Sequence, residues 1–178
     1  LCHALHLHDL LCFILGDVES VYAQVATRVN PIETEDCAML SLKMKNGALV
    51  SSSATLGSRD EISRLRFCFE NFTAESNLEP YNPGRDPWTT TPKDVKQDRR
   101  ITDALQTFTP PISDFAGQFM NLYDAIHGKA DLSVTLQDAR RSLELVTAIY
   151  ASAQSGQAEV LPISSSHPLY KNWQPSID

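Results

Sequence analysis

The 178-residue chain is poor in the features that mark several protein classes. Its four cysteines form no C-x-x-C pair, which argues against a structural zinc site or a disulfide framework, and we predict no bound metal. The net charge is -7 and no long Lys/Arg run occurs, so neither nucleic acid nor an anionic membrane is an expected partner. No apolar stretch is long enough to span a bilayer. A G-x-G-x-x-G motif after a strand is also missing, so we predict no cofactor-binding residues in this chain.

The composition that remains is that of a globular domain. At 178 residues and 42% hydrophobic content, the chain can bury a substantial core, and we predict one domain over residues 1–178. Cys12, Cys37 and Cys68 lie in apolar runs, which is typical of small buried side chains in a reducing compartment. We therefore expect a cytoplasmic protein.

The first sixteen residues, LCHALHLHDLLCFILG, predict an apolar helix that carries three histidines and Asp9. The sequence starts inside this helix, without an initiator Met or an N-cap residue. A helix that opens without a cap leaves its first N–H donors unsatisfied. We therefore expect the natural chain to continue upstream.

Alternating apolar and polar residues predict four successive strands, over residues 20–28, 36–44, 48–56 and 64–71. Asn46-Gly47 between two of them is a hairpin signal. The predicted fold class is α+β, with an open, mainly antiparallel sheet and helices packed on one face. The other face carries mixed polar residues, namely Ser41, Ser51, Ser53, Thr55 and Arg66. Such a face can meet water or a second copy, so self-association through it is a hypothesis.

Residues 76–111 hold six prolines and predict a long loop within the domain, with one further strand near 105–109. Aromatic and guanidinium side chains in this segment are candidates for covering a sugar-like substrate: Tyr81, Trp88, Arg99 and Arg100. An irregular surface loop without a ligand is an equally good interpretation.

Two helices and a short strand complete the predicted domain. Ser113 is a candidate N-cap for a helix with Phe115, Phe119, Leu122 and Ile126 at helical spacing, and Gly128 ends it. Thr135 and Asp138 resemble a capping box before the second helix. Its predicted apolar stripe consists of Leu136, Ala139, Leu143, Val146 and Tyr150. Residues 159–163 predict a last strand.

Taken in order, several segments resemble the C-terminal domain of Gfo/Idh/MocA-type oxidoreductases. Residues 6–11 (HLHDLL), followed by Leu15-Gly16 and Val18-Glu19-Ser20-Val21, resemble the H-x-x-D-L-L…L-G-x-V-x-S-V segment that opens that domain. The turn at 45–48 resembles its central hairpin, and Asp124-Ala125-Ile126-His127-Gly128 its "F…AI-x-G" helix. No single motif is specific, but the ordered set spans nearly the whole chain.

The resemblance implies an N-terminal Rossmann domain, absent from these residues, that binds NAD or NADP. It implies oxidation or reduction at a CH–OH group of a sugar, cyclitol or related polyol. His6 falls at the family's catalytic histidine and would act as acid/base, with Asp9 one helical turn along as its support. By this interpretation the isolated chain is inactive, and its partners are a small polyol, its own Rossmann domain and further copies of itself.

One position departs from the family pattern. Many members place Asp four residues before the catalytic histidine, and this chain has Cys2, which we keep as a substrate-contact candidate. A neutral thiol stabilises an imidazolium less than a carboxylate does. The alternative is therefore a non-catalytic binding or assembly module that keeps the fold. A parent enzyme that oxidises its substrate only transiently, within an elimination or hydrolysis, is a third possibility.

The other histidines of the first helix have simpler interpretations. His3 and His8 lie on a nearly all-apolar helix, and we expect them to be buried core residues rather than catalytic groups. Cys2, His3 and His6 also lie at helical spacing for a transition metal, but zinc needs three or four convergent ligands and no others can be named.

Overall fold

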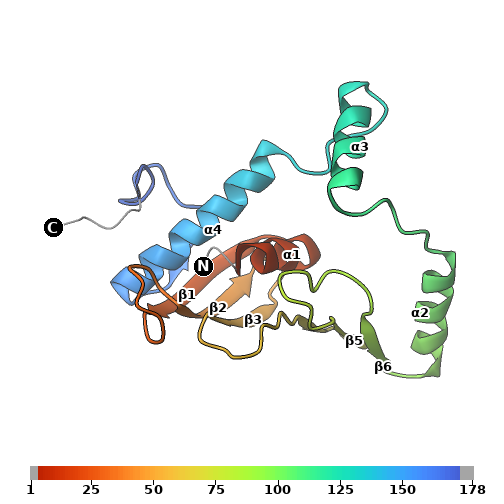
Figure 1. The fold of residues 1–178 in the computed structure, drawn as a ribbon, viewed down its shortest axis with the longest axis horizontal. Helices are drawn as coiled ribbons and strands as arrows, with labels where there is room; N and C mark the ends of the chain where they lie inside the picture. Colours follow the sequence, from red (N-terminus) through yellow and green to blue (C-terminus); the bar gives the residue numbers. More distant parts are fainter. Residues whose placement is uncertain (1–3, 173–178) are drawn as a thin grey trace. The chain divides into compact units, whose positions relative to one another are not determined.

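The computed structural model describes residues 4–172, which form two compact units. The first unit contains residues 4–63, 78–84 and 140–172, and the second contains residues 64–77 and 85–139. Each unit is described by itself below (Figure 1). The prediction of a single domain over 1–178 stays a prediction.

The first unit is a four-stranded antiparallel sheet covered by two helices. The strand order is β3 (Leu49–Thr55), β2 (Cys37–Met44), β1 (Val18–Ala26) and β7 (Glu159–Val160). The helices α1 (Leu5–Leu15) and α4 (Leu136–Ser155, from Arg140 in this unit) contribute to one core with the sheet (Figure 1). The predicted fold class, α+β with antiparallel strands and helices packed against the sheet, is confirmed.

The core of the first unit follows the alternation of β2. Leu40, Leu42 and Met44 are buried, and the residues between them are exposed. The buried side chains meet Leu145 and Ile149 of α4, while α1 adds Leu11 to the same cluster. The exposed face carries Ser41, Ser51, Ser53 and Thr55, as expected from the period of two.

A single carboxylate organises the connection between β1 and β2. Asp36 is buried, and its two oxygens accept backbone N–H groups of Arg28, Val29 and Asn30, each at 2.7 Å. These hydrogen bonds, first those from Asn30 and Arg28, hold the pKa of Asp36 far below its usual range. The backbone of residues 28–30 is thereby held by a buried side chain.

The second unit contains a smaller sheet and two helices. Its strands are β4 (Arg66–Cys68), β5 (Phe72–Glu75) and β6 (Thr89–Pro92), paired antiparallel in that order, and its helices are α2 (Val95–Thr107) and α3 (Asp114–Ile126). Phe67 is the buried centre of an aromatic cluster on this sheet. Its ring stacks on Phe69 with centroids 6.0 Å apart and on Trp88 at 6.1 Å.

Three expectations about this region are wrong. Residues 64–71 do not join the first sheet, so Arg66 does not lie on its exposed face. Residues 76–111 are not one long loop, because β6 and α2 lie within them. The strand expected near 105–109 is instead the end of α2, since Asp94 caps that helix by accepting the N–H of Gln97 and the helix continues to Thr107.

The last two helices are where they were predicted, with one correction. The capping box at the start of α4 is present: Thr135 N–H donates to Asp138 Oδ2 at 2.8 Å, and Asp138 N–H to Thr135 Oγ1 at 3.4 Å. The predicted stripe of α4 is wrong, because Leu136 and Leu143 are exposed. The buried face instead consists of Leu145, Thr147, Ala148, Ile149, Ala151 and Ser152. Cys68 is also exposed rather than buried.

Candidate functional site

The candidate site is centred on α1, which presents two histidines in opposite environments. His6 is exposed, whereas His8 is only 4% exposed and neither of its ring nitrogens has a hydrogen-bond partner among residues 4–172. Burial lowers the pKa of His8 to about 4, so this ring is neutral at pH 7. Of these two side chains, His6 is therefore the one that can meet a ligand.

Asp9, one turn beyond His6, contacts the neighbouring helix. Ser142 Oγ of α4 donates to Asp9 Oδ1 at 3.1 Å. Residues three apart lie on the same side of a helix, so Asp9 and His6 share a face of α1. The hydrogen bond from Ser142 therefore attaches α1 to α4 one helical turn from His6. Asp9 is thus hydrogen-bonded to a neighbouring helix.

The far end of α1 is fixed by the hairpin turn and again by α4. Asn46 Nδ2 donates to the carbonyl oxygen of Leu15 at 2.9 Å, which satisfies an orphan acceptor at the helix end. Asp17 pairs with Lys45 at 3.0 Å and with Arg141 at 3.7 Å. The hydrogen bond from Lys45 is the main cause that lowers the pKa of Asp17. The helix α1 is therefore held near its middle, at Asp9, and at its C-terminal end.

A short segment of the chain, residues 78–84, belongs to the same unit and packs against α1. A Cβ added at Gly84 would lie 3.4 Å from Leu10 Cδ2, so the backbone of Gly84 is in contact distance of that side chain. Leu10 follows His6 by four residues and shares its face of α1. Tyr81 lies in this segment, half exposed, with its N–H donating to the buried Ser63 Oγ at 3.0 Å.

The remaining predicted substrate contacts lie elsewhere. Trp88 belongs to the second unit, half-buried in the aromatic cluster with Phe67. Arg99 and Arg100 are exposed on α2 of that unit, and Arg100 Nη1 donates to Gln97 Oε1 at 3.1 Å. Cys2 and His3 lie outside the described residues. The structure therefore places His6 and Asp9 on α1 and brings the 78–84 segment, through Gly84, against Leu10 of the same helix, within the first unit.

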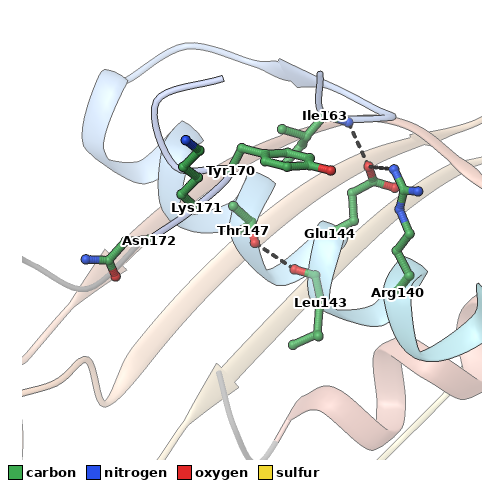
Figure 2. A pocket seen from close by; sticks show the side chains of 8 residues that line it. All are labelled: Arg140, Leu143, Glu144, Thr147, Ile163, Tyr170, Lys171 and Asn172. Carbon is green, nitrogen blue, oxygen red and sulfur yellow. Dashed lines mark hydrogen bonds and ion pairs between the residues drawn. The ribbon is translucent and has the colours of Figure 1, made fainter. Parts of the chain in front are cut away.

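A hollow of about 750 Å³ lies elsewhere in the first unit, between α4 and residues 163–172 (Figure 2). The Tyr170 ring lies across it, with Lys171 on one side and Arg140 on the other. Glu144 Oε1 accepts the N–H of Ile163 at 2.9 Å and lies 4.0 Å from Arg140. His6 does not line this hollow.

Among residues 4–172, no three or more His, Cys, Asp or Glu side chains gather in a way that would hold a metal ion. None of the described helices is both long enough and apolar enough to cross a lipid bilayer.

The comparisons with known proteins identify the family of this chain. Residues 1–162 match the Gfo/Idh/MocA oxidoreductase family, C-terminal alpha/beta domain. The chain belongs to this family. No curated protein matches it.

Solved structures of the same family superimpose on most of the chain. The WlbA dehydrogenase from Bordetella pertussis, in complex with NADH and UDP-GlcNAcA, is 26% identical with a TM-score of 0.69, over 90% of this chain and 44% of that one. WlbA from Chromobacterium violaceum, with the same two ligands, is 27% identical with a TM-score of 0.71, over 90% of this chain and 45% of that one. Aldose-aldose oxidoreductase from Caulobacter crescentus, at 16% identity, a TM-score of 0.68, and 89% and 46% coverage, shares the fold.

This chain therefore spans less than half the length of each of these three proteins. We call the part of their chains that it does not cover the companion half.

The sequence did not reveal two groups that shape the candidate site. Ser142 was missed because a serine inside a predicted helix carries no signal of a partner more than a hundred residues away. The packing of Gly84 on Leu10 was missed because the prolines around it predicted an irregular loop. The signal that the sequence offers is a glycine between short polar turns, because a residue without a side chain lets the backbone approach another element closely.

Proposed function

We propose that this chain is the substrate-binding and assembly domain of an NAD(P)-dependent oxidoreductase that acts on a CH–OH group of a sugar or related polyol. His6 is the acid/base and Asp9 its support. The observation that carries this proposal is the exposed imidazole of His6 on a helix held at Asp9 and Asp17, in a chain of this family. We further propose that the complete protein also contains a companion half, and that a Rossmann domain within it supplies the nicotinamide.

The chemistry asked of this chain is the movement of one proton. When bound, the nicotinamide takes or gives the hydride at the reacting carbon. The imidazole of His6 removes the hydroxyl proton as the carbonyl forms and returns it in the reverse direction. Imidazole suits this role because its ordinary titration range lies near neutrality. Holding the ring on a braced helix keeps its nitrogen within reach of the hydroxyl, which is where positioning contributes to the rate.

The proposed substrate class rests on the relatives and on the neighbours of α1. Both WlbA structures hold a nucleotide sugar, UDP-GlcNAcA, together with NADH. In this chain, Tyr81 is the aromatic candidate that lies in the same unit as α1, in the segment whose Gly84 approaches Leu10. Cys2, Trp88 and Arg100 remain further proposed contacts, and their substitution should raise KM more than it lowers kcat.

The same proposal assigns assembly to the exposed face of the first sheet. Tyr22, Met39 and Leu49 stand exposed among serines and threonines on that face. A second copy that pairs there would bury these apolar side chains. Met39→Lys should then halve the particle mass measured by light scattering, and an unchanged mass would remove this part of the proposal.

The division of labour has a direct test. NADH is titrated calorimetrically into the 178-residue chain and into the complete polypeptide with its companion half. We expect binding only by the complete polypeptide, and turnover when a panel of nucleotide sugars, free sugars and cyclitols is added with NAD or NADP. Tight NADH binding by the 178 residues alone would contradict the proposal. Binding by the complete polypeptide without turnover of any panel member would favour the non-catalytic module.

A further inference from the structure

Residues 79–82 form a tight turn with an unusual residue at its third position. The N–H of Asn82 donates to the carbonyl oxygen of Glu79 at 3.3 Å and closes the turn. Pro80 occupies the second position and Tyr81 the third, where the backbone is left-handed with a φ of 61°. Turns with these two features favour glycine or asparagine at the third position, because a Cβ atom in the left-handed region crowds the backbone. Tyr81 therefore holds a conformation that raises the free energy of the folded chain.

Contacts on both sides of the turn hold it in this conformation. The Tyr81 N–H donates to Oγ of the buried Ser63 at 3.0 Å, and the Ser63 N–H donates to the carbonyl oxygen of Leu78 at 3.4 Å. After the turn, the backbone of Gly84 lies against Leu10 of α1. All of these residues belong to the first unit. Backbone strain that neighbouring contacts maintain in this way is concentrated at binding and catalytic sites in proteins.

The sequence holds better residues for such a turn close by, but at other positions. In the segment EPYNPG, Asn82 follows Tyr81 directly and Gly84 lies three residues on. A shift of one residue would place asparagine, which tolerates the left-handed region, at the third position. Packing within the chain covers only half of Tyr81, which is 50% exposed. The tyrosine ring, rather than the turn itself, is therefore the feature that a function has to explain.

The turn lies close to the face of α1 that carries His6. Leu10 follows His6 by four residues, so the two share a face of the helix and lie about 6 Å apart along its axis. Gly84 contacts Leu10, and the Cα atom of Tyr81, three residues earlier, is at most about 11 Å from that of Gly84. A molecule whose hydroxyl group meets His6 therefore extends over a face of α1 that this segment borders.

We infer that Tyr81 is a specificity-determining residue whose ring packs against the carbon–hydrogen face of a sugar or cyclitol ring. This inference rests on the proposed function, in which a hydroxyl group of the same substrate meets His6. A sugar or cyclitol ring has an apolar face bordered by hydroxyl groups, and tyrosine combines a large apolar surface with one polar group. Because the strained turn holds the tyrosine in place before the ligand binds, less conformational freedom is lost on binding.

Melting temperatures of the complete polypeptide without substrate test whether the strain is present. Tyr81→Gly removes the ring and relieves the left-handed backbone, so its melting temperature should equal or exceed that of the wild type. Tyr170 is similarly exposed, at 48%, but is not among the residues with positive φ. Tyr170→Gly is therefore the matched control and should lower the melting temperature. A fall of about 2 °C or more in Tyr81→Gly would overturn the inference, because the ring would then be packed within the polypeptide.

Calorimetry tests the contact between the ring and the substrate. The panel of nucleotide sugars, free sugars and cyclitols is titrated into the complete polypeptide loaded with NADH. For the panel member that binds the wild type most tightly, Tyr81→Gly should weaken binding about tenfold or more. Tyr81→Phe keeps the ring and should restore binding to within about threefold of the wild type, while Tyr170→Gly should not change it.

Equal binding by the wild type and Tyr81→Gly would overturn the inference, as would a wild type that binds no panel member. None of these measurements requires turnover. Binding that depends on Tyr81 without any turnover would therefore support the inference and count against the catalytic part of the proposed function alone.

Discussion

Helices α4 and α3 both carry apolar residues at helical spacing, but α4 has a buried face and α3 has no buried residue. From Leu145 to Ser152, α4 turns apolar and small side chains into the core of the first unit and leaves its charges outside. Helix α3 has only small or polar residues half-buried, and its Phe115 and Phe119 are exposed within the second unit. Helical spacing of apolar residues therefore shows that a helix forms and that one face will be covered. It does not show whether the cover comes from the same unit.

This contrast predicts a large difference between two truncations. Ile149 is fully buried, so Ile149→Ala should lower the free energy of unfolding by about 2–5 kcal/mol through lost burial and a cavity. Phe119→Ala, at an exposed position of α3, should change the free energy of unfolding by less than about 0.5 kcal/mol in the 178-residue chain. Urea unfolding of the two variants measures both values. Comparable losses would mean that α3 is already packed in the chain.

The next effect separates the two histidines of α1. Because burial lowers the pKa of His8 to about 4, the unfolded chain binds a proton there at a higher pH than the folded chain does. Stability contributed by neutral His8 is therefore complete above the ordinary histidine pKa of about 6.5 and is lost as the pH falls towards 4. The full loss is about 3 kcal/mol for this group.

Urea unfolding of wild type and His8→Leu at pH 7 and pH 4.5 isolates this effect. The difference in stability between the two proteins should shift in favour of the variant at the lower pH. A difference that does not change with pH would show that the ring of His8 is hydrated or hydrogen-bonded in solution.

A smaller effect is expected where α1 meets α4. Ser142→Ala removes the donor to Asp9, and because Asp9 is exposed and Ser142 only half-buried, the loss of stability should stay at or below about 1 kcal/mol. In the complete polypeptide the same change should lower kcat by a small factor at unchanged NADH affinity, since it loosens the helix that carries His6. Stopped-flow kinetics with Ser142→Thr as the conservative control separates loss of the hydroxyl from a change of side-chain size.

The sequence predicted most of the first unit because its patterns are local. The alternation of β2 and the Asn46-Gly47 turn each depend on neighbours a few residues away. The second unit was predicted poorly because its prolines were taken as signs of a loop. Pro92 lies at the end of β6 and precedes the capping residue Asp94, so it marks a boundary between elements.

The candidate site also has a part that local patterns predict and a part that depends on long-range contacts. The H-x-x-D spacing located His6 and Asp9, since residues three apart share a helix face. The contact of Asp9 with Ser142 and that of Gly84 with Leu10 join segments far apart in the chain, and no local pattern encodes them. Which of two nearby histidines is exposed also depended on the sheet beneath α1.

The central claim is that His6 handles the substrate proton while the redox carrier is held elsewhere. Steady-state kinetics of His6→Gln in the complete polypeptide tests it most directly, with His127→Gln as the matched exposed histidine. We predict that His6→Gln lowers kcat by about 10²–10⁴-fold at unchanged NADH affinity, and that His127→Gln has no effect on kcat. A His6→Gln enzyme with the wild-type kcat would contradict the account.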